Sequence, residues 1–242
     1  LPRNYVKNEE KTYPLFIVLD GDYLFEVVSG NVDYYSYWED MPEAIIVGVN
    51  QVDTRDADCY YSEQNYLPVD TGADFFEFLG QELIPYITET YRTANFKVAV
   101  GHGETANFIN YYLFKDNPLF QAYIVISPDL APGMIDNITQ RLKQFQTKLF
   151  YYLATAHNDI RPLREDAIIL NTNLSKIDNT QLVYGFNNFE NPTHYSLPAY
   201  AIPKALENIF FVFQPISKNE YIEHILNLET SPVDYLKEKY QS

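Results

Sequence analysis

Five short, almost continuously apolar segments, separated by longer stretches with helical spacing, constrain the fold of this chain most strongly. They are LFIVLDG (15–21), AIIVGVN (44–50), FKVAVGHG (96–103), AYIVISP (122–128) and KLFYYLAT (148–155). Unbroken runs of β-branched and other apolar residues are typical of strands that are buried on both faces of a parallel sheet. We therefore expect these segments to form parallel strands.

The stretches between the strands have the spacing of amphipathic helices. We expect helices over residues 70–91, 104–114, 135–145 and 197–213. A repeated strand-then-helix order implies right-handed crossovers, so the chain is predicted to have an α/β fold with a doubly wound, mostly parallel sheet flanked by helices. The irregular segments 31–43 and 50–72 are too long for tight turns and are expected to be substrate loops.

Composition limits the number of domains. The 242 residues are 46% hydrophobic and contain no Pro/Gly-rich linker, so we expect one α/β domain over residues 1–213. Residues 214–242 are expected to form a polar tail of two short helices. The first residues resemble the interior of a domain, and a further domain upstream or downstream is a possible partner.

Charge and residue types exclude several functions. A formal charge of -16 has the wrong sign for binding nucleic acid or an anionic membrane through a basic face. No apolar run is long enough to span a bilayer, so we expect a soluble chain, although periplasmic, secreted and cytoplasmic locations all stay open. Cys59 is the only cysteine and the four histidines are dispersed, so neither a metal nor another cofactor is expected.

The segment VAVGHGETANF (98–108) contains the most informative motif. In the nucleophile elbow G-x-S-x-G, a tight turn between a strand and a helix exposes a serine hydroxyl above the sheet. The five positions here are Gly101, His102, Gly103, Glu104 and Thr105, so a glycine stands where the motif has serine. Taken alone, a glycine here is explained better by a strained turn without any chemistry.

Over residues 1–213 the chain resembles the Putative esterase branch of the α/β-hydrolases, which includes enterochelin esterases, S-formylglutathione hydrolase and feruloyl esterases. The segments that carry this resemblance are YPLFIVLDGDYLF, AIIVGVN with Arg55 after it, ELIPYITETYRT before a strand and GH, FQAYIVISPDL, FYYLATAHND and NPTHYSLPAYAIPKALENIF. The resemblance implies an α/β-hydrolase fold and a small-molecule carboxylic ester as substrate.

The resemblance also implies roles for individual residues. Gly103 occupies the nucleophile position, Asp159 would orient the imidazole, and His194 would be the general base. The oxyanion hole would consist of the backbone N–H of Glu104 and one from the loop after the first strand. That second donor would be Gly21 or Asp22.

Aromatic residues suggest a substrate pocket. We expect Tyr35, Trp38 and Tyr195 to line it, although ordinary loop packing explains the aromatic run 34–38 equally well in a chain with 22 tyrosines. His102 is expected to pack under the elbow.

Gly103 is the serious departure from the family pattern. Loss of a triad serine typically removes about 10⁶ of kcat, so the chain as written is expected to be catalytically silent. Thr105, Ser127 and Ser196 do not stand at the apex of the elbow, and no replacement nucleophile is expected.

Three interpretations stay open. The first is a serine esterase whose serine has been exchanged for glycine, which predicts that Asp159 and His194 keep their catalytic positions. The second is a naturally inactive relative that serves as a binding or protein-interaction module, which predicts an altered or blocked pocket. The third is a purely structural domain. The retained acid and histidine favour the first, while the ester itself could be a siderophore, sugar or feruloyl ester or a thioester.

Overall fold

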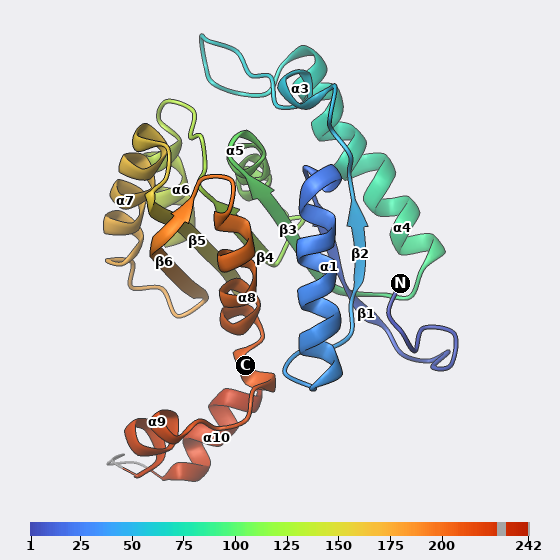
Figure 1. Ribbon diagram of the computed structural model, residues 1–242, viewed down its shortest axis with the longest axis vertical. Coiled ribbons are helices and arrows are strands. Elements are labelled where there is room, and N and C mark those ends of the chain that lie inside the picture. Colours follow the sequence, from blue (N-terminus) through green and yellow to red (C-terminus); the bar gives the residue numbers. More distant parts are fainter. Residues whose placement is uncertain (227–230, 242) are drawn as a thin grey trace.

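The computed structural model, which describes residues 1–226 and 231–241, has a six-stranded parallel sheet with helices on both faces (Figure 1). The strands are β1 (Tyr13–Val18), β2 (Ile45–Gly48), β3 (Thr93–His102), β4 (Ala122–Ile126), β5 (Leu149–Asn158) and β6 (Leu182–Thr193). Their order is β2-β1-β3-β4-β5-β6, so the chain starts inside the sheet and extends it first to one side and then to the other. This arrangement confirms the predicted doubly wound α/β fold.

The sheet separates two hydrophobic cores because successive side chains of a strand point to opposite faces. In β1, Leu15 and Ile17 belong to one core and Phe16 and Val18 to the other. The second core is covered by α1 (Gly21–Tyr37) and α8 (Leu197–Ile209). The first is covered by α3 (Asp70–Glu77), α4 (Ile84–Thr90), α5 (Glu104–Ile109), α6 (Met134–Lys143) and α7 (Arg161–Leu174).

One predicted loop is wrong, and several elements were not predicted, among them helix α1. Residues 31–37 are the second half of α1 and not a substrate loop, because Val28 and Val32 are buried one turn apart against the sheet. Helix α7 was not expected, nor was β6. Strand β6 lies at the edge of the sheet, is only partly buried and has the Asn-containing sequence LVYGFNNFENPT, so it lacks the apolar run of a central strand.

The segment 50–72 does lie outside regular structure for most of its length. It follows β2 and contains one short helix, α2 (Arg55–Asp58). Because all six strands are parallel, the loops that follow them meet at one edge of the sheet. Open α/β sheets bind their ligands at this edge.

The last described part of the chain is helical. It consists of α9 (Lys218–Glu220), one wide turn (Tyr221–Leu226) and α10 (Pro232–Gln241), which lie below α8 and away from the sheet in Figure 1. Residues 227–230 and 242 of the predicted tail lie outside the described residues. Across residues 1–226 and 231–241, no helix combines the length and the apolar character that crossing a bilayer requires.

Candidate active site

The turn between β3 and α5 has the backbone of a nucleophile elbow. Gly103 has φ 63° and ψ -121°, a combination of backbone angles that residues other than glycine adopt only under strain. Its carbonyl oxygen accepts hydrogen bonds from the N–H groups of Asn107 at 3.2 Å and Asp129 at 3.0 Å. Gly101 is also required, because a Cβ there would lie 2.6 Å from the carbonyl of Thr105. The helix therefore packs against the strand as the motif demands.

His194 faces the apex of this turn. A Cβ built on Gly103 would lie 3.8 Å from its Nε2, so a hydroxyl one bond further out would come within hydrogen-bonding reach. The other ring nitrogen, Nδ1, lies 2.9 Å from Asp159 Oδ1 and 3.0 Å from Ser127 Oγ. A proton on Nδ1 is held by the carboxylate, which leaves Nε2 to accept one. The structure thus brings together the three positions that the sequence indicated.

The carboxyl group of Asp159 is fully buried and well supplied with donors. Besides His194, it accepts hydrogen bonds from Thr155 Oγ1 and from the Ile160 N–H, both at 2.8 Å. Burial alone raises the pKa of Asp159, but the hydrogen bonds outweigh it and the net pKa is lower than usual. Asp159 is therefore ionised at neutral pH, as an orienting acid must be.

His102 packs against the imidazole of His194. The two ring centroids lie 4.3 Å apart at an interplanar angle of 29°. Burial, with smaller contributions from His194 and Arg55, lowers the pKa of His102 to about 3, so the ring is neutral. Its Nδ1 lies 3.0 Å from the Tyr23 hydroxyl, which donates to Asp20 at 2.9 Å. Its geometry fits the packing role that the sequence suggested.

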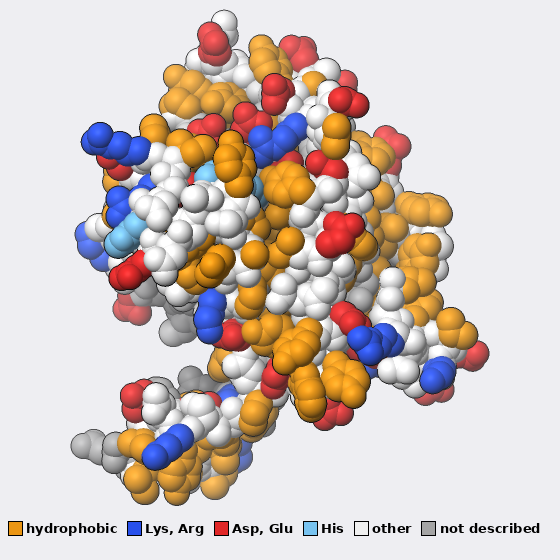
Figure 2. Space-filling model, in the orientation of Figure 1, with side chains coloured by type: hydrophobic (Ala, Val, Ile, Leu, Met, Phe, Trp, Pro, Cys, Tyr) orange, Lys and Arg blue, Asp and Glu red, His pale blue; other side chains and the backbone are white. Residues whose placement is uncertain are grey.

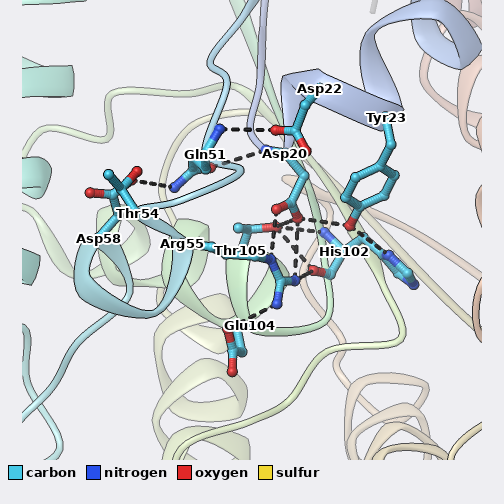
Figure 3. A network of polar contacts seen from close by, with 10 residues as sticks. All are labelled: Asp20, Asp22, Tyr23, Gln51, Thr54, Arg55, Asp58, His102, Glu104 and Thr105. Atoms are coloured by element: carbon cyan, nitrogen blue, oxygen red, sulfur yellow. Dashed lines mark hydrogen bonds and ion pairs between the residues drawn. The ribbon is translucent and has the colours of Figure 1, made fainter.

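A polar network centred on Arg55 joins the segments that follow β1, β2 and β3 (Figure 3). Arg55 donates from Nε to Asp20 at 2.6 Å, from Nη1 to Glu104 at 2.9 Å, and from Nη2 to the His102 carbonyl at 2.8 Å. The buried Thr105 hydroxyl donates to Asp20 at 2.6 Å. The sequence did not indicate this role of Asp20 and Thr105. One sequence signal was available: Asp20 directly follows an apolar strand, and an acid that is buried at such a position requires a hydrogen-bonding or charged partner.

Arg55 also limits the space at the nucleophile position. The Cβ built on Gly103 would lie 3.2 Å from Arg55 Nη2, which is tight for such a contact. A serine at position 103 therefore requires the guanidinium to shift by a few tenths of an ångström. Position 103 is therefore sterically tight, but it can accommodate a serine side chain.

The predicted oxyanion donors are only partly available. The Gly21 N–H donates to the Val49 carbonyl at 2.8 Å, so Gly21 is not a free donor. This leaves the N–H groups of Asp22 and Glu104 as the predicted pair. The Glu104 carboxylate turns to Arg55, and burial raises its pKa while Arg55 opposes that rise.

Two predicted pocket residues lie elsewhere. Tyr35 donates its hydroxyl to Glu207 at 2.9 Å, and Trp38 is 61% exposed just past the end of α1. Helix α1 begins at the site, and its rise of about 1.5 Å per residue carries Tyr35 roughly 20 Å away, so this prediction is wrong. Tyr195, 85% exposed, lies at the rim with its ring edge-on to His194 at 5.3 Å.

A different cavity adjoins the elbow. It has a volume of about 270 Å³ and is bounded by the loops that follow β2, β3 and β4. Its lining consists of four acidic residues, two tyrosines and two buried residues: Asp56, Glu63, Glu104, Asp129, Tyr60, Tyr61, Cys59 and Asn107. Figure 2 shows acidic side chains on the upper part of the molecule, over the loops near α3.

Known proteins resemble this chain in sequence and in fold. Residues 1–170 match the family described as Putative esterase. Among solved structures, an uncharacterised protein from Capnocytophaga ochracea is 29% identical with a TM-score of 0.82, over 96% of this chain and 65% of its own. An IroE-like serine hydrolase from Shewanella oneidensis is 21% identical with a TM-score of 0.76, over 100% and 82% of the two chains.

A more distant structure has the same fold. The siderophore hydrolase EstB from Aspergillus nidulans is 16% identical with a TM-score of 0.63, over 83% of each chain. No curated protein matches the sequence. The chain spans 65% of the length of the Capnocytophaga protein.

Proposed function

Because this chain belongs to the Putative esterase family, we propose that its site binds carboxylic esters and leaves them uncleaved, since position 103 has no nucleophile. One observation carries the proposal. The Nε2 atom of His194 lies 3.8 Å from the Cβ position of Gly103, while Nδ1 of the same ring is bound to Asp159. The acid and the base are arranged for a serine that the chain does not contain.

With serine at position 103, the chemistry follows from these contacts. His194 Nε2 takes the hydroxyl proton as the oxygen attacks the ester carbonyl, and the N–H groups of Asp22 and Glu104 stabilise the oxyanion. His194 then gives its proton to the departing alcohol. Water, deprotonated by the same nitrogen, releases the acid and restores the serine.

The pair of His194 and Asp159 favours an esterase that lacks only its nucleophile. A module adapted to another role would have no reason to keep a general base and the acid that orients it. A siderophore ester is one candidate substrate class, because the name of one structural relative describes a siderophore hydrolase.

The test is a comparison of three variants with the native chain. Gly103→Ser is expected to hydrolyse p-nitrophenyl acetate and butyrate, with kcat about 10⁶-fold above that of the native chain. Gly103→Ala is the matched control, because it adds the same Cβ in the same strained backbone but no hydroxyl. Gly103→Ser/His194→Ala is expected to lose the activity again.

The outcomes separate clearly. Activity that needs both serine and His194 supports the proposal. A Gly103→Ser variant that melts cooperatively, yet is as inactive as Gly103→Ala, would overturn it.

A further inference from the structure

The Ser127 hydroxyl lies beside the general base but takes no part in the proton transfers of ester hydrolysis. We propose that Ser127 is a positioning residue, whose hydroxyl holds the imidazole of His194 so that Nε2 faces position 103. This inference rests on the proposed function, because it concerns the base of the same site.

The backbone at Ser127 is strained. Ser127 directly follows β4 and has φ 43°, in the left-handed region that favours glycine. Pro128 comes next, and a residue before proline is normally confined to extended backbone angles. Strain of this kind persists at sites where the surrounding structure must hold a particular side chain in place. Glycine would fit this backbone without strain, but it would supply no hydroxyl.

The segment around Ser127 is bonded to the nucleophile position on both sides. The Ile126 carbonyl accepts a hydrogen bond from the Gly103 N–H at 3.0 Å, and the Asp129 N–H donates to the Gly103 carbonyl, also at 3.0 Å. The Ser127 N–H donates to the Ala154 carbonyl on β5 at 2.7 Å. Ser127 is therefore fixed relative to the elbow, and a bond from its side chain to the base sets the base relative to position 103.

The Ser127 side chain is fully buried and contacts both the acid and the base. Its Oγ lies 3.0 Å from Nδ1 of His194, and it also forms a side-chain hydrogen bond with Asp159. Burial, the largest influence, raises the pKa of Asp159, and the hydrogen bonds from His194 and Ser127 are among those that bring the net pKa below its usual value. The hydroxyl thus belongs to the same hydrogen-bonded group as the acid and the base.

The chemistry of a hydroxyl decides the direction of these bonds. An ionised carboxylate only accepts hydrogen bonds, so the single hydroxyl proton of Ser127 goes to Asp159. The Ser127 oxygen can then only accept from His194, which requires a proton on Nδ1. That N–H is shared between Asp159 Oδ1 at 2.9 Å and Ser127 Oγ at 3.0 Å. Nε2 is left without a proton, as a general base requires.

A second partner restricts the ring in a way that the carboxylate alone does not. An imidazole that is bonded to one oxygen can still tilt about that bond. When two oxygens share the same N–H, a tilt toward either one lengthens the bond to the other. His102 stacks on the ring of His194 with 4.3 Å between centroids and limits motion on that face. Such restriction matters, because a displacement of about 1 Å at a reacting centre can cost about 10²-fold in rate.

The native chain tests the inference without any catalysis. In ¹⁵N-labelled protein, we expect the Nδ1 proton of His194 to give a downfield NMR signal that exchanges slowly with water, because two acceptors hold it. The signal is assigned by its loss in His194→Ala. Ser127→Gly and Ser127→Ala remove the hydroxyl, and each should speed the exchange of this proton about tenfold.

Kinetics in the Gly103→Ser background supply the second measurement. Ser127→Gly and Ser127→Ala should each lower kcat for p-nitrophenyl butyrate about 10- to 100-fold and change KM less than about twofold, because the hydroxyl acts on the base and not on substrate binding. Glycine fits the left-handed backbone better than alanine, so Ser127→Gly should be the more stable of the two in urea unfolding. An equal loss of kcat at unequal stability assigns the effect to the hydroxyl. Ser175→Ala is the matched control, because that hydroxyl is exposed and bonds to the Thr172 carbonyl.

Two results would overturn the inference. One is a Nδ1 proton of His194 that the native chain protects no better than Ser127→Gly does. The other is a kcat that follows stability, with Ser127→Ala impaired and Ser127→Gly as active as its Gly103→Ser parent. Failure of the proposed function is a separate result: if Gly103→Ser is folded and inactive, proton exchange in the native chain still decides the role of Ser127.

Discussion

The candidate active site has two halves, the pair of His194 and Asp159 and the turn at Gly103, and they differ in which features of a serine esterase site they retain. On one side, Nδ1 of His194 lies within hydrogen-bonding distance of Asp159 and Ser127, and Thr155 donates a hydrogen bond to Asp159. On the other side, Gly103 contributes only a hydrogen atom, yet its backbone retains the geometry of an elbow.

The difference shows that the two halves depend on different parts of the chain. The elbow is maintained by backbone hydrogen bonds, by the close approach at Gly101 and by the Arg55 network, none of which involves a side chain at position 103. The base is maintained by the side chains themselves. A side chain can therefore be added at position 103 with only a small shift of the Arg55 guanidinium, whereas the base cannot be changed without disturbing its partners.

The largest expected effect lies on the histidine side. In the Gly103→Ser background, Asp159→Asn should lower kcat about 10⁴-fold, because an amide favours the wrong protonation of His194. Hydrolysis of p-nitrophenyl acetate measures this, and Asp178→Asn, an exposed carboxylate elsewhere, is the control. A loss of kcat below about tenfold would show that the base depends less on its side-chain partners than their contacts indicate.

The next effect concerns the nucleophile side. Thr105→Val should destabilise the native chain by about 1–3 kcal/mol, because it leaves Asp20 and the His102 N–H without their buried hydroxyl partner. Urea unfolding measures the loss. Thr139→Val is the matched control, since that hydroxyl bonds only to the Ile135 carbonyl within its own helix. Equal losses in the two variants would contradict a special role for Thr105.

A pH series sharpens the comparison for Asp159. A carboxyl with a lower pKa in the folded chain stabilises it above its unfolded pKa, about 3.9, and loses that contribution as pH falls through the folded value. The native chain should therefore exceed Asp159→Asn in unfolding free energy by about 1–2 kcal/mol near pH 7. This difference should narrow below about pH 4. A difference in unfolding free energy between the two proteins that stays constant down to about pH 2 would contradict a stabilising hydrogen bond between Asp159 and His194.

The smallest effect is expected outside both halves. In the Gly103→Ser background, Trp38→Ala should change kcat/KM less than about twofold, because Trp38 is exposed and substitutions of exposed residues away from the site rarely have large effects. Steady-state kinetics with p-nitrophenyl butyrate measure this. A tenfold rise in KM would return Trp38 to the substrate pocket.

The sequence predicted those parts of the fold that repeated patterns of apolar residues encode. Buried parallel strands have strong local signals. The elbow motif alone is weak without its serine, so the family resemblance was needed to identify it and to supply Asp159 and His194, which lie 35 residues apart in the chain and touch in the fold. Strand β6 had no such signal, because an edge strand needs no continuous apolar run. Helix α1 was also not predicted, since its tyrosine-rich second half has the composition of a loop.

Contacts between distant loops could not be predicted from local pattern. The pairing of Arg55 with Asp20 and the cavity around Tyr60 depend on which loops the strand order brings together. Tyr35 and Trp38 were misplaced for the same reason, since composition indicates an aromatic wall but not the end of the helix on which it stands. The Gly21 N–H was lost as a donor through a backbone contact with Val49.

The carbonyl of Gly103 accepts hydrogen bonds from both Asn107 and Asp129, and this has an evolutionary consequence. A substitution or deletion that moves the loop of Asp129 to admit a new ligand also displaces the apex where a nucleophile must stand. Residues 60–63 lie on a longer loop after β2 and carry no such bond to Gly103 among the described contacts. New specificities in descendants of this chain should therefore arise first in residues 60–63, with the loop of Asp129 the slower to diverge.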